Sequence, residues 1–157
     1  MRPTPDRLRE SLFSILAPRI EGAVFIDAYA GSGAVGIEAL SRGAKRVILI
    51  ERSPAALTVI RENLASLGIA NRISVLRGKA ATLLPDNPAD IVFLDPPYEM
   101  VNEYHDSLLA LAAARCPLVI AQHPSRLKLE ESYADLTQTR VLKQGDNSLT
   151  FYAPKSD

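Results

Sequence analysis

Short, mostly apolar segments alternate along the chain with segments whose apolar residues recur at the spacing of an α-helix. The apolar segments span residues 23–26, 46–50, 73–76, 91–94 and 118–121. Such runs, bounded by turn residues, are typical of strands buried on both faces of a parallel sheet. The intervening stretches predict helices over residues 34–41, from Ser53 to Gly68 and over 102–114. The alternation predicts an α/β fold with a mainly parallel sheet and helices on both of its faces.

The two ends of the chain depart from this alternation. Apolar residues on one stripe predict a first helix over residues 4–17, with Thr4 or Asp6 as its cap and Pro18 as its end. Near the other end, runs over 136–142 and 149–152 flank a polar turn and predict a C-terminal antiparallel hairpin.

Length and composition narrow the class of protein. A chain of 157 residues without a linker or a repeat predicts one domain over residues 1–157. The hydrophobic fraction is 47%, and no apolar stretch reaches the roughly 20 residues of a membrane helix. No leader of the basic-then-apolar kind is evident, so we expect a soluble, cytoplasmic protein. The single cysteine, Cys116, excludes an internal disulfide.

Charge is balanced overall but uneven along the chain. Eighteen basic and 18 acidic side chains cancel, so bulk attraction to nucleic acid is not indicated. The first segment nevertheless concentrates Arg2, Arg7 and Arg9. Two interpretations stay open, contacts to RNA phosphates and a solvated helix face.

A glycine-rich segment, residues 27–36, stands between the first predicted strand and its helix. Glycines at 31 and 33 let the backbone turn tightly and approach a ligand closely. Glu51 ends the second strand, where a carboxylate can accept the hydroxyls of a ribose. The pattern indicates a nucleoside-containing ligand, and a plain strand-to-helix turn is the alternative.

The acid at the start of this segment discriminates between nucleoside cofactors. Asp27 would repel a pyrophosphate but can pair with the ammonium group of a methionine moiety. Nothing in the chain supplies a partner for hydride transfer. The acid therefore favours S-adenosylmethionine over a nicotinamide cofactor.

A second motif, Asp95-Pro96-Pro97-Tyr98, comes directly after the fourth strand. The two prolines cannot continue a ladder, so the chain must leave the sheet there. Ligands of open parallel sheets bind beyond the carboxyl ends of the strands, where this loop would stand. A carboxylate, a fixed carbonyl and a phenol ring can hold a flat base that bears an amine. A simple strand-ending turn is the alternative.

With both motifs in place, the chain resembles the Rossmann-type S-adenosylmethionine-dependent methyltransferases. Within them it is similar to the RsmD-like family, bacterial 16S ribosomal RNA guanine-N2 methyltransferases. The resemblance rests on residues 2–13, residues 27–43, the Asp95–Tyr98 loop and the closing hairpin, including Gln144-Gly145-Asp146. It implies a Rossmann-like methyltransferase fold and S-adenosylmethionine as cofactor. The implied cofactor residues are Asp27, Ala28, Gly31, Ser32, Gly33, Glu51, Arg52, Lys79 and Ala80.

The resemblance also implies a substrate and a catalytic loop. The expected reaction is methyl transfer to the exocyclic N2 amine of a guanine in small-subunit ribosomal RNA, by a monomer and without a metal. The Asp95 carboxylate and the Pro96 carbonyl would accept the amine protons, Pro97 would fix the carbonyl, and Tyr98 would stack on an extruded base. Arg2, Arg7 and Arg9 would bind the RNA of the assembling small subunit.

The chain departs from the family pattern at two places. Family members carry a basic hairpin before residue 2, and here Met1 stands directly before that segment. Lys79 occupies the place of an acid that meets the adenine amine, so backbone groups near Lys79 and Ala80 are expected to hold adenine.

Two alternative functions stay open. One is an adenine-N6 DNA methyltransferase, which shares the Asp95–Tyr98 loop, and the other is a non-catalytic nucleoside-binding module.

Overall fold

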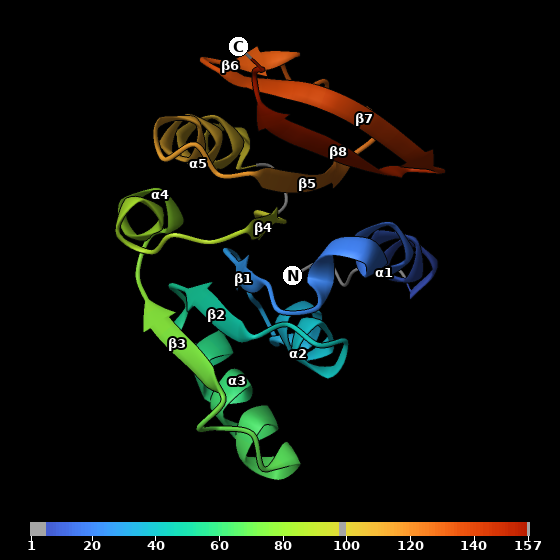
Figure 1. The fold of residues 1–157 in the computed structure, drawn as a ribbon. Helices are drawn as coiled ribbons and strands as arrows, with labels where there is room; N and C mark the ends of the chain where they lie inside the picture. Colours follow the sequence, from blue (N-terminus) through green and yellow to red (C-terminus); the bar gives the residue numbers. More distant parts are fainter. Residues whose placement is uncertain (1–5, 98–99, 157) are drawn as a thin grey trace.

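A computed structural model describes residues 6–97 and 100–156 of the protein, and one eight-stranded sheet forms its centre (Figure 1). The strands are β1 (Val24–Asp27), β2 (Arg46–Glu51), β3 (Ile73–Arg77), β4 (Ile91–Leu94), β5 (Leu118–Pro124), β6 (Ser132–Tyr133), β7 (Leu136–Gln144) and β8 (Asn147–Pro154). Their order is β3-β2-β1-β4-β5-β8-β7-β6. Strands β1 to β5 are parallel, and β8, β7 and β6 join them in antiparallel pairs. The predicted α/β fold with a C-terminal hairpin is confirmed.

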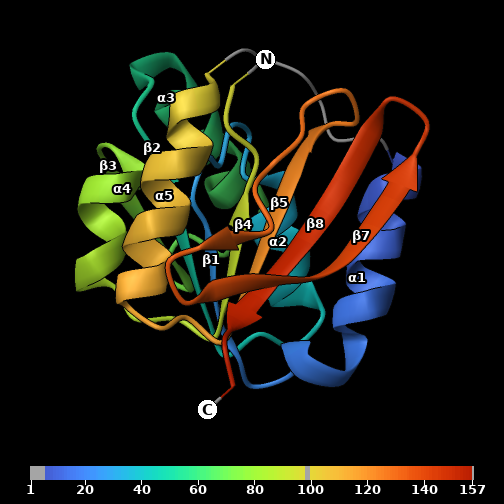
Figure 2. The same ribbon diagram turned by 90° about the horizontal axis from the view of Figure 1, so that it is seen from above.

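Helices cover both faces of the sheet (Figure 2). One face carries α1 (Asp6–Ile20), α2 (Ala34–Ser41) and α3 (Pro54–Leu67); the other carries α4 (Ala80–Leu83), the 3-10 turn η1 (Leu84–Asp86) and α5 (Val101–Ala113). Strand residues alternate between the two cores: Phe25 and Leu49 pack toward α1 and α2, whereas Ile26 and Ile48 pack toward α5. Among the described helices, none is both long and apolar enough to cross a membrane.

Some predicted boundaries were wrong. Helix α1 does not end at Pro18 but continues to Ile20. Pro18 lacks an N–H group and cannot bond to the Ser14 carbonyl, but the buried Leu16 and Ile20 hold the last turns on the core. Strand β5 extends beyond residue 121 to Pro124, because its antiparallel partner β8 pairs with it as far as Asn147. The short elements α4, η1 and β6 carry too few residues to show a period.

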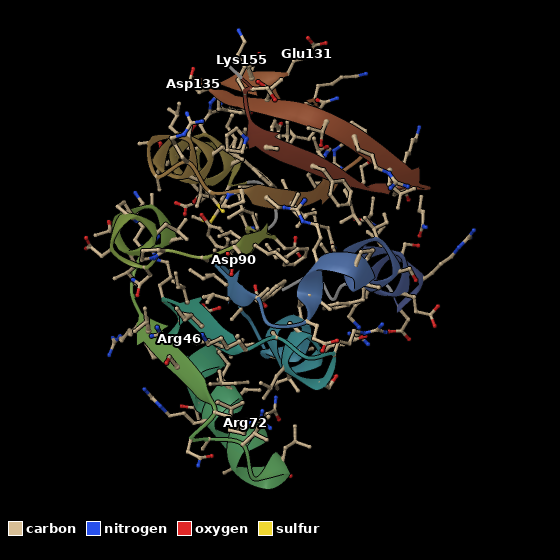
Figure 3. All side chains as sticks on the ribbon, in the orientation of Figure 1. Arg46, Arg72, Asp90, Glu131, Asp135 and Lys155 are labelled. Atoms are coloured by element: carbon tan, nitrogen blue, oxygen red, sulfur yellow. The ribbon has the colours of Figure 1, made fainter. Side chains whose placement is uncertain are left out.

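The parallel topology separates two edges of the sheet. Arg46, Arg72 and Asp90 stand at or just before the starts of β2, β3 and β4, at the amino edge (Figure 3). There the Asp90 carboxylate accepts the Val24 N–H at 2.8 Å. Both sequence motifs stand at the opposite, carboxyl ends of their strands. The topology thus brings them to one edge.

Candidate active site

A cavity of about 440 Å³ opens at the carboxyl edge, between the β1–α2 loop and the loop after β4. This volume is typical of sites for nucleoside-sized ligands. The charged side chains along its wall are Asp6, Asp27, Glu51, Asp95 and Glu103, with Arg9 and Arg52. Acids outnumber bases, so the cavity is suited to a ligand that carries positive charge.

The glycine-rich loop is fixed to the sheet on both sides. The Ala28 N–H donates to the Phe93 carbonyl and the Ala30 N–H to the Ile50 carbonyl, each at 3.0 Å. Gly31 lies on the cavity wall with a φ of 59°, a conformation that favours glycine. The loop therefore presents its backbone to any ligand in the cavity.

The other two glycines of the motif serve packing. Gly33 caps the start of α2 with a φ of 87°, and a Cβ there would lie 3.2 Å from Leu49. A Cβ at Gly36 would collide with the same Leu49 side chain. Gly33 and Gly36 thus let α2 approach β2 closely, and neither lines the cavity.

Glu51, at the end of β2, is held by backbone N–H groups. Its Oε1 accepts the Gly31 N–H at 2.8 Å, and its Oε2 accepts those of Arg52 at 3.0 Å and Ser53 at 2.9 Å. Glu51 also lines the cavity. A carboxylate has about four acceptor positions, so this one keeps capacity for a ligand hydroxyl.

Asp27 is the last residue of β1 and is 2% exposed. Its Oδ1 has no hydrogen-bond partner. Burial, with the nearby charges of Asp95 and Glu51, raises the pKa of Asp27 to about 7, and backbone N–H groups of Tyr29 and Gly36 partly oppose the shift. A cationic ligand in the cavity would stabilise the ionised carboxylate.

The loop after β4 forms the opposite wall. Asp95 is half-buried, Pro96 is buried and Pro97 is exposed, and all three line the cavity. Tyr98 lies outside the described residues. The loop is joined to α5 because the Met100 N–H donates to the Pro97 carbonyl at 3.1 Å.

Tyr29 and Glu103 also line the cavity, and the sequence predicted no role for either. The Tyr29 hydroxyl lies 2.9 Å from Glu103 Oε1 and 2.7 Å from Ser107 Oγ. Burial raises the pKa of Tyr29 well above its usual range. Tyr29 stands inside the glycine motif, which was a signal, but the helical pattern around Glu103 gives no sign that this acid is buried at the cavity.

The remaining predicted cofactor residues divide into two groups. Ala28, Ser32, Arg52 and Ala80 line the cavity. Lys79 does not; its ammonium lies 3.9 Å from the Asp106 carboxylate of α5. Within the described ranges, no group of three or more His, Cys, Asp or Glu side chains could hold a metal ion.

The amino-terminal arginines are placed differently from one another. Arg9 lies at the cavity, and its Nε is 3.1 Å from Glu38 Oε1. Arg7 is exposed, and Arg2 lies outside the described residues. The charge of Arg9 is therefore partly balanced within the fold.

Comparisons with known proteins point to one family. The family model described as "Conserved hypothetical protein 95" matches residues 1–153. "Putative rRNA methyltransferase YlbH" of Bacillus subtilis is 32% identical over 161 residues, 96% of this chain and 86% of the relative. "Ribosomal RNA small subunit methyltransferase D" of Escherichia coli is 46% identical over 100 residues, 62% of this chain and 50% of the relative.

Solved structures share the fold. "Putative methyltransferase yhhF from Escherichia coli" matches with a TM-score of 0.83 and 31% identity, over 99% of this chain and 92% of that chain. An RNA methyltransferase from Salinibacter ruber in complex with S-adenosyl-L-homocysteine has a TM-score of 0.75 at 17% identity, over 99% and 95%, which shows the fold alone. Fold and comparisons define an S-adenosylmethionine-dependent methyltransferase. The chain belongs to the RsmD/YlbH family, the one described as "Conserved hypothetical protein 95".

Proposed function

We propose that the protein transfers a methyl group from S-adenosylmethionine to the exocyclic N2 amine of a guanine in small-subunit ribosomal RNA. One observation carries the proposal. A single cavity has the glycine-rich loop on one wall and Asp95, Pro96 and Pro97 on the other. A cofactor and a target amine bound there would be neighbours.

The residues of the cavity suit S-adenosylmethionine, which would supply an electrophilic methyl group on a sulfonium. Asp27, with its unpartnered buried Oδ1, would pair with the ammonium group. Glu51 would accept a ribose hydroxyl, and the Gly31 and Ser32 backbone would border the ligand. Arg52 and the Ala80 backbone, which line the cavity, would border the nucleoside. An acid-lined cavity would disfavour the pyrophosphate of a dinucleotide.

The loop after β4 would prepare the amine. An exocyclic amine is a weak nucleophile because its lone pair is delocalised into the ring. The Asp95 carboxylate and the Pro96 carbonyl would accept hydrogen bonds from its two N–H groups and direct the lone pair into the cavity, and Asp95 would take the one proton that the amine loses on methylation. Pro97 would fix the carbonyl, and Tyr98 would stack on an extruded base.

The substrate class comes from the relatives, two of which are named rRNA methyltransferases. Arg2, Arg7 and Arg9 would contact RNA phosphates, and of these Arg9 lies at the cavity. The partner would be ribosomal RNA or the assembling small subunit.

Parallel transfer assays test the proposal. Labelled S-adenosylmethionine is incubated with the protein and naked 16S ribosomal RNA, assembled small subunits or duplex DNA. The proposal expects label in an RNA-containing substrate and none in DNA. Label in DNA alone would instead support the adenine-N6 enzyme, and label in no substrate despite cofactor binding would support a non-catalytic module.

A further inference from the structure

We propose that Tyr29, Glu103 and Ser107 form a latch through which cofactor binding stabilises the first turns of α5, next to the loop that carries Asp95. This Tyr29 latch joins the two walls of the cavity and would make Tyr29 and Glu103 positioning residues. The inference rests on the proposed function, because it assumes that the cavity binds the cofactor on one wall and the base on the other.

The hydrogen bonds of the latch have a defined direction. A carboxylate oxygen can only accept, so the Tyr29 hydroxyl donates to Glu103 Oε1 at 2.9 Å. The hydroxyl has one proton, so the Ser107 hydroxyl donates to Tyr29 at 2.7 Å. Glu103 is 7% exposed and Ser107 is fully buried. Leaving buried polar groups of this kind without a partner costs free energy, so the hydrogen bonds of the latch are favoured over their broken state.

The position of the latch connects both motifs. Tyr29 lies between Ala28 and Ala30, whose N–H groups fix the glycine-rich loop to β4 and β2. On the other side, the Glu103 N–H donates to the Met100 carbonyl at 3.0 Å, and the Met100 N–H donates to the Pro97 carbonyl. A short chain of hydrogen bonds, from Tyr29 through Glu103 and Met100 to Pro97, therefore connects the glycine-rich loop to the loop after β4.

This arrangement predicts a coupling between the two sites. A ligand that fixes the glycine-rich loop would also fix the Tyr29 hydroxyl, and through Glu103 the first turns of α5. Coupling free energies are reciprocal, so an ordered α5 would in turn favour the cofactor. If the Tyr29 hydroxyl served only to stabilise the fold, ligand binding at the glycine-rich loop would not change the stability of α5.

Hydrogen exchange of residues 100–107, measured with and without saturating S-adenosylhomocysteine, tests the latch. In the wild-type protein we expect the ligand to slow exchange there by about fivefold, the lower end of typical couplings. Tyr29→Phe keeps the ring, removes the hydroxyl and should abolish this added protection. It should also raise KM for the RNA substrate more than it lowers kcat.

Matched variants separate the latch from general stability. Tyr152→Phe removes another tyrosine hydroxyl, which donates to the Glu130 carbonyl at 2.8 Å away from the cavity, and should keep the protection. Glu103→Gln keeps an acceptor oxygen and should retain most of it, whereas Glu103→Ala should not.

Two results would overturn the latch: no ligand-induced protection of residues 100–107 in the wild type, or equal protection in Tyr29→Phe. Calorimetry on the wild-type protein reports separately on the proposed function. If S-adenosylhomocysteine does not bind at all, the proposed function fails, and the latch fails with it. If it binds but Tyr29→Phe behaves as the wild type, only the latch fails.

Discussion

Glu51 Oε1 accepts the backbone N–H of Gly31 at 2.8 Å, so the end of β2 and the glycine-rich loop are joined before any ligand arrives. The second oxygen of Glu51 is held by the N–H groups of Arg52 and Ser53. A carboxylate fixed in this way loses little conformational entropy when it binds a hydroxyl. The relationship makes Glu51 a preorganised acceptor at the cavity wall.

Replacing Glu51 should therefore weaken cofactor binding. Loss of a charged hydrogen bond costs about 1 to 3 kcal/mol, so Glu51→Ala should raise the Kd for S-adenosylhomocysteine about tenfold or more. Calorimetry measures this, with Glu62→Ala as control because Glu62 is an exposed acid of α3. Unchanged affinity in Glu51→Ala would remove Glu51 from the site.

Asp27 should make cofactor affinity depend on pH. Its pKa of about 7 leaves the carboxyl mostly neutral at pH 6 and mostly ionised at pH 8. If only the ionised form pairs with the ammonium group, affinity should rise about tenfold between these values. In Asp27→Asn the affinity should be weak and nearly flat with pH. The same flat profile in the wild type would contradict the assignment.

Asp95 should be needed for transfer but not for cofactor binding. We expect Asp95→Ala to lower kcat about a hundredfold or more, a typical loss for a group that accepts a proton. Because the charge of Asp95 raises the pKa of Asp27, both assays should be run at pH 8, where Asp27 is ionised in either protein. Parallel loss of affinity and of transfer in a folded variant would show that Asp95 does not act on the base.

The amino-terminal arginines should contribute to the salt dependence of RNA binding. Each phosphate contact releases counterions, so every arginine replaced should lower the slope of log affinity against log salt by about 0.7 to 0.9. The variant replaces Arg2, Arg7 and Arg9 with alanine; the control replaces Arg46 and Arg72, which are exposed at the amino edge of the sheet. An unaltered slope would leave the cluster a structural role, for which the Arg9–Glu38 pair is already evidence.

Sequence patterns predicted the strands and the edge of the sheet that holds the site. Both follow from the residues within and directly after each strand. Buried runs such as Ile91–Leu94 have a simple apolar signature, and the parallel topology puts the loops after these strands at one edge. Contacts between distant segments carry no such signature. Tyr29 and Glu103 are 74 positions apart, and no local period shows that they meet.

The same limit applies to side-chain direction and to helix ends. The sequence placed Lys79 after the third strand but could not show that its ammonium faces Asp106 of α5. It stopped the first helix at Pro18, because the packing of Ile20 beneath the sheet is a tertiary effect. Local propensity yields to burial at such positions.

Nucleoside mass spectrometry identifies the atom that the protein methylates. Small subunits from cells that lack this protein are incubated with S-adenosylmethionine and either the wild-type protein or Asp95→Ala, and their RNA is digested to nucleosides. The account predicts new N2-methylguanosine with the wild type and little or none with Asp95→Ala. A methyl group found instead on adenine N6, or the same yield of N2-methylguanosine with Asp95→Ala, would contradict it.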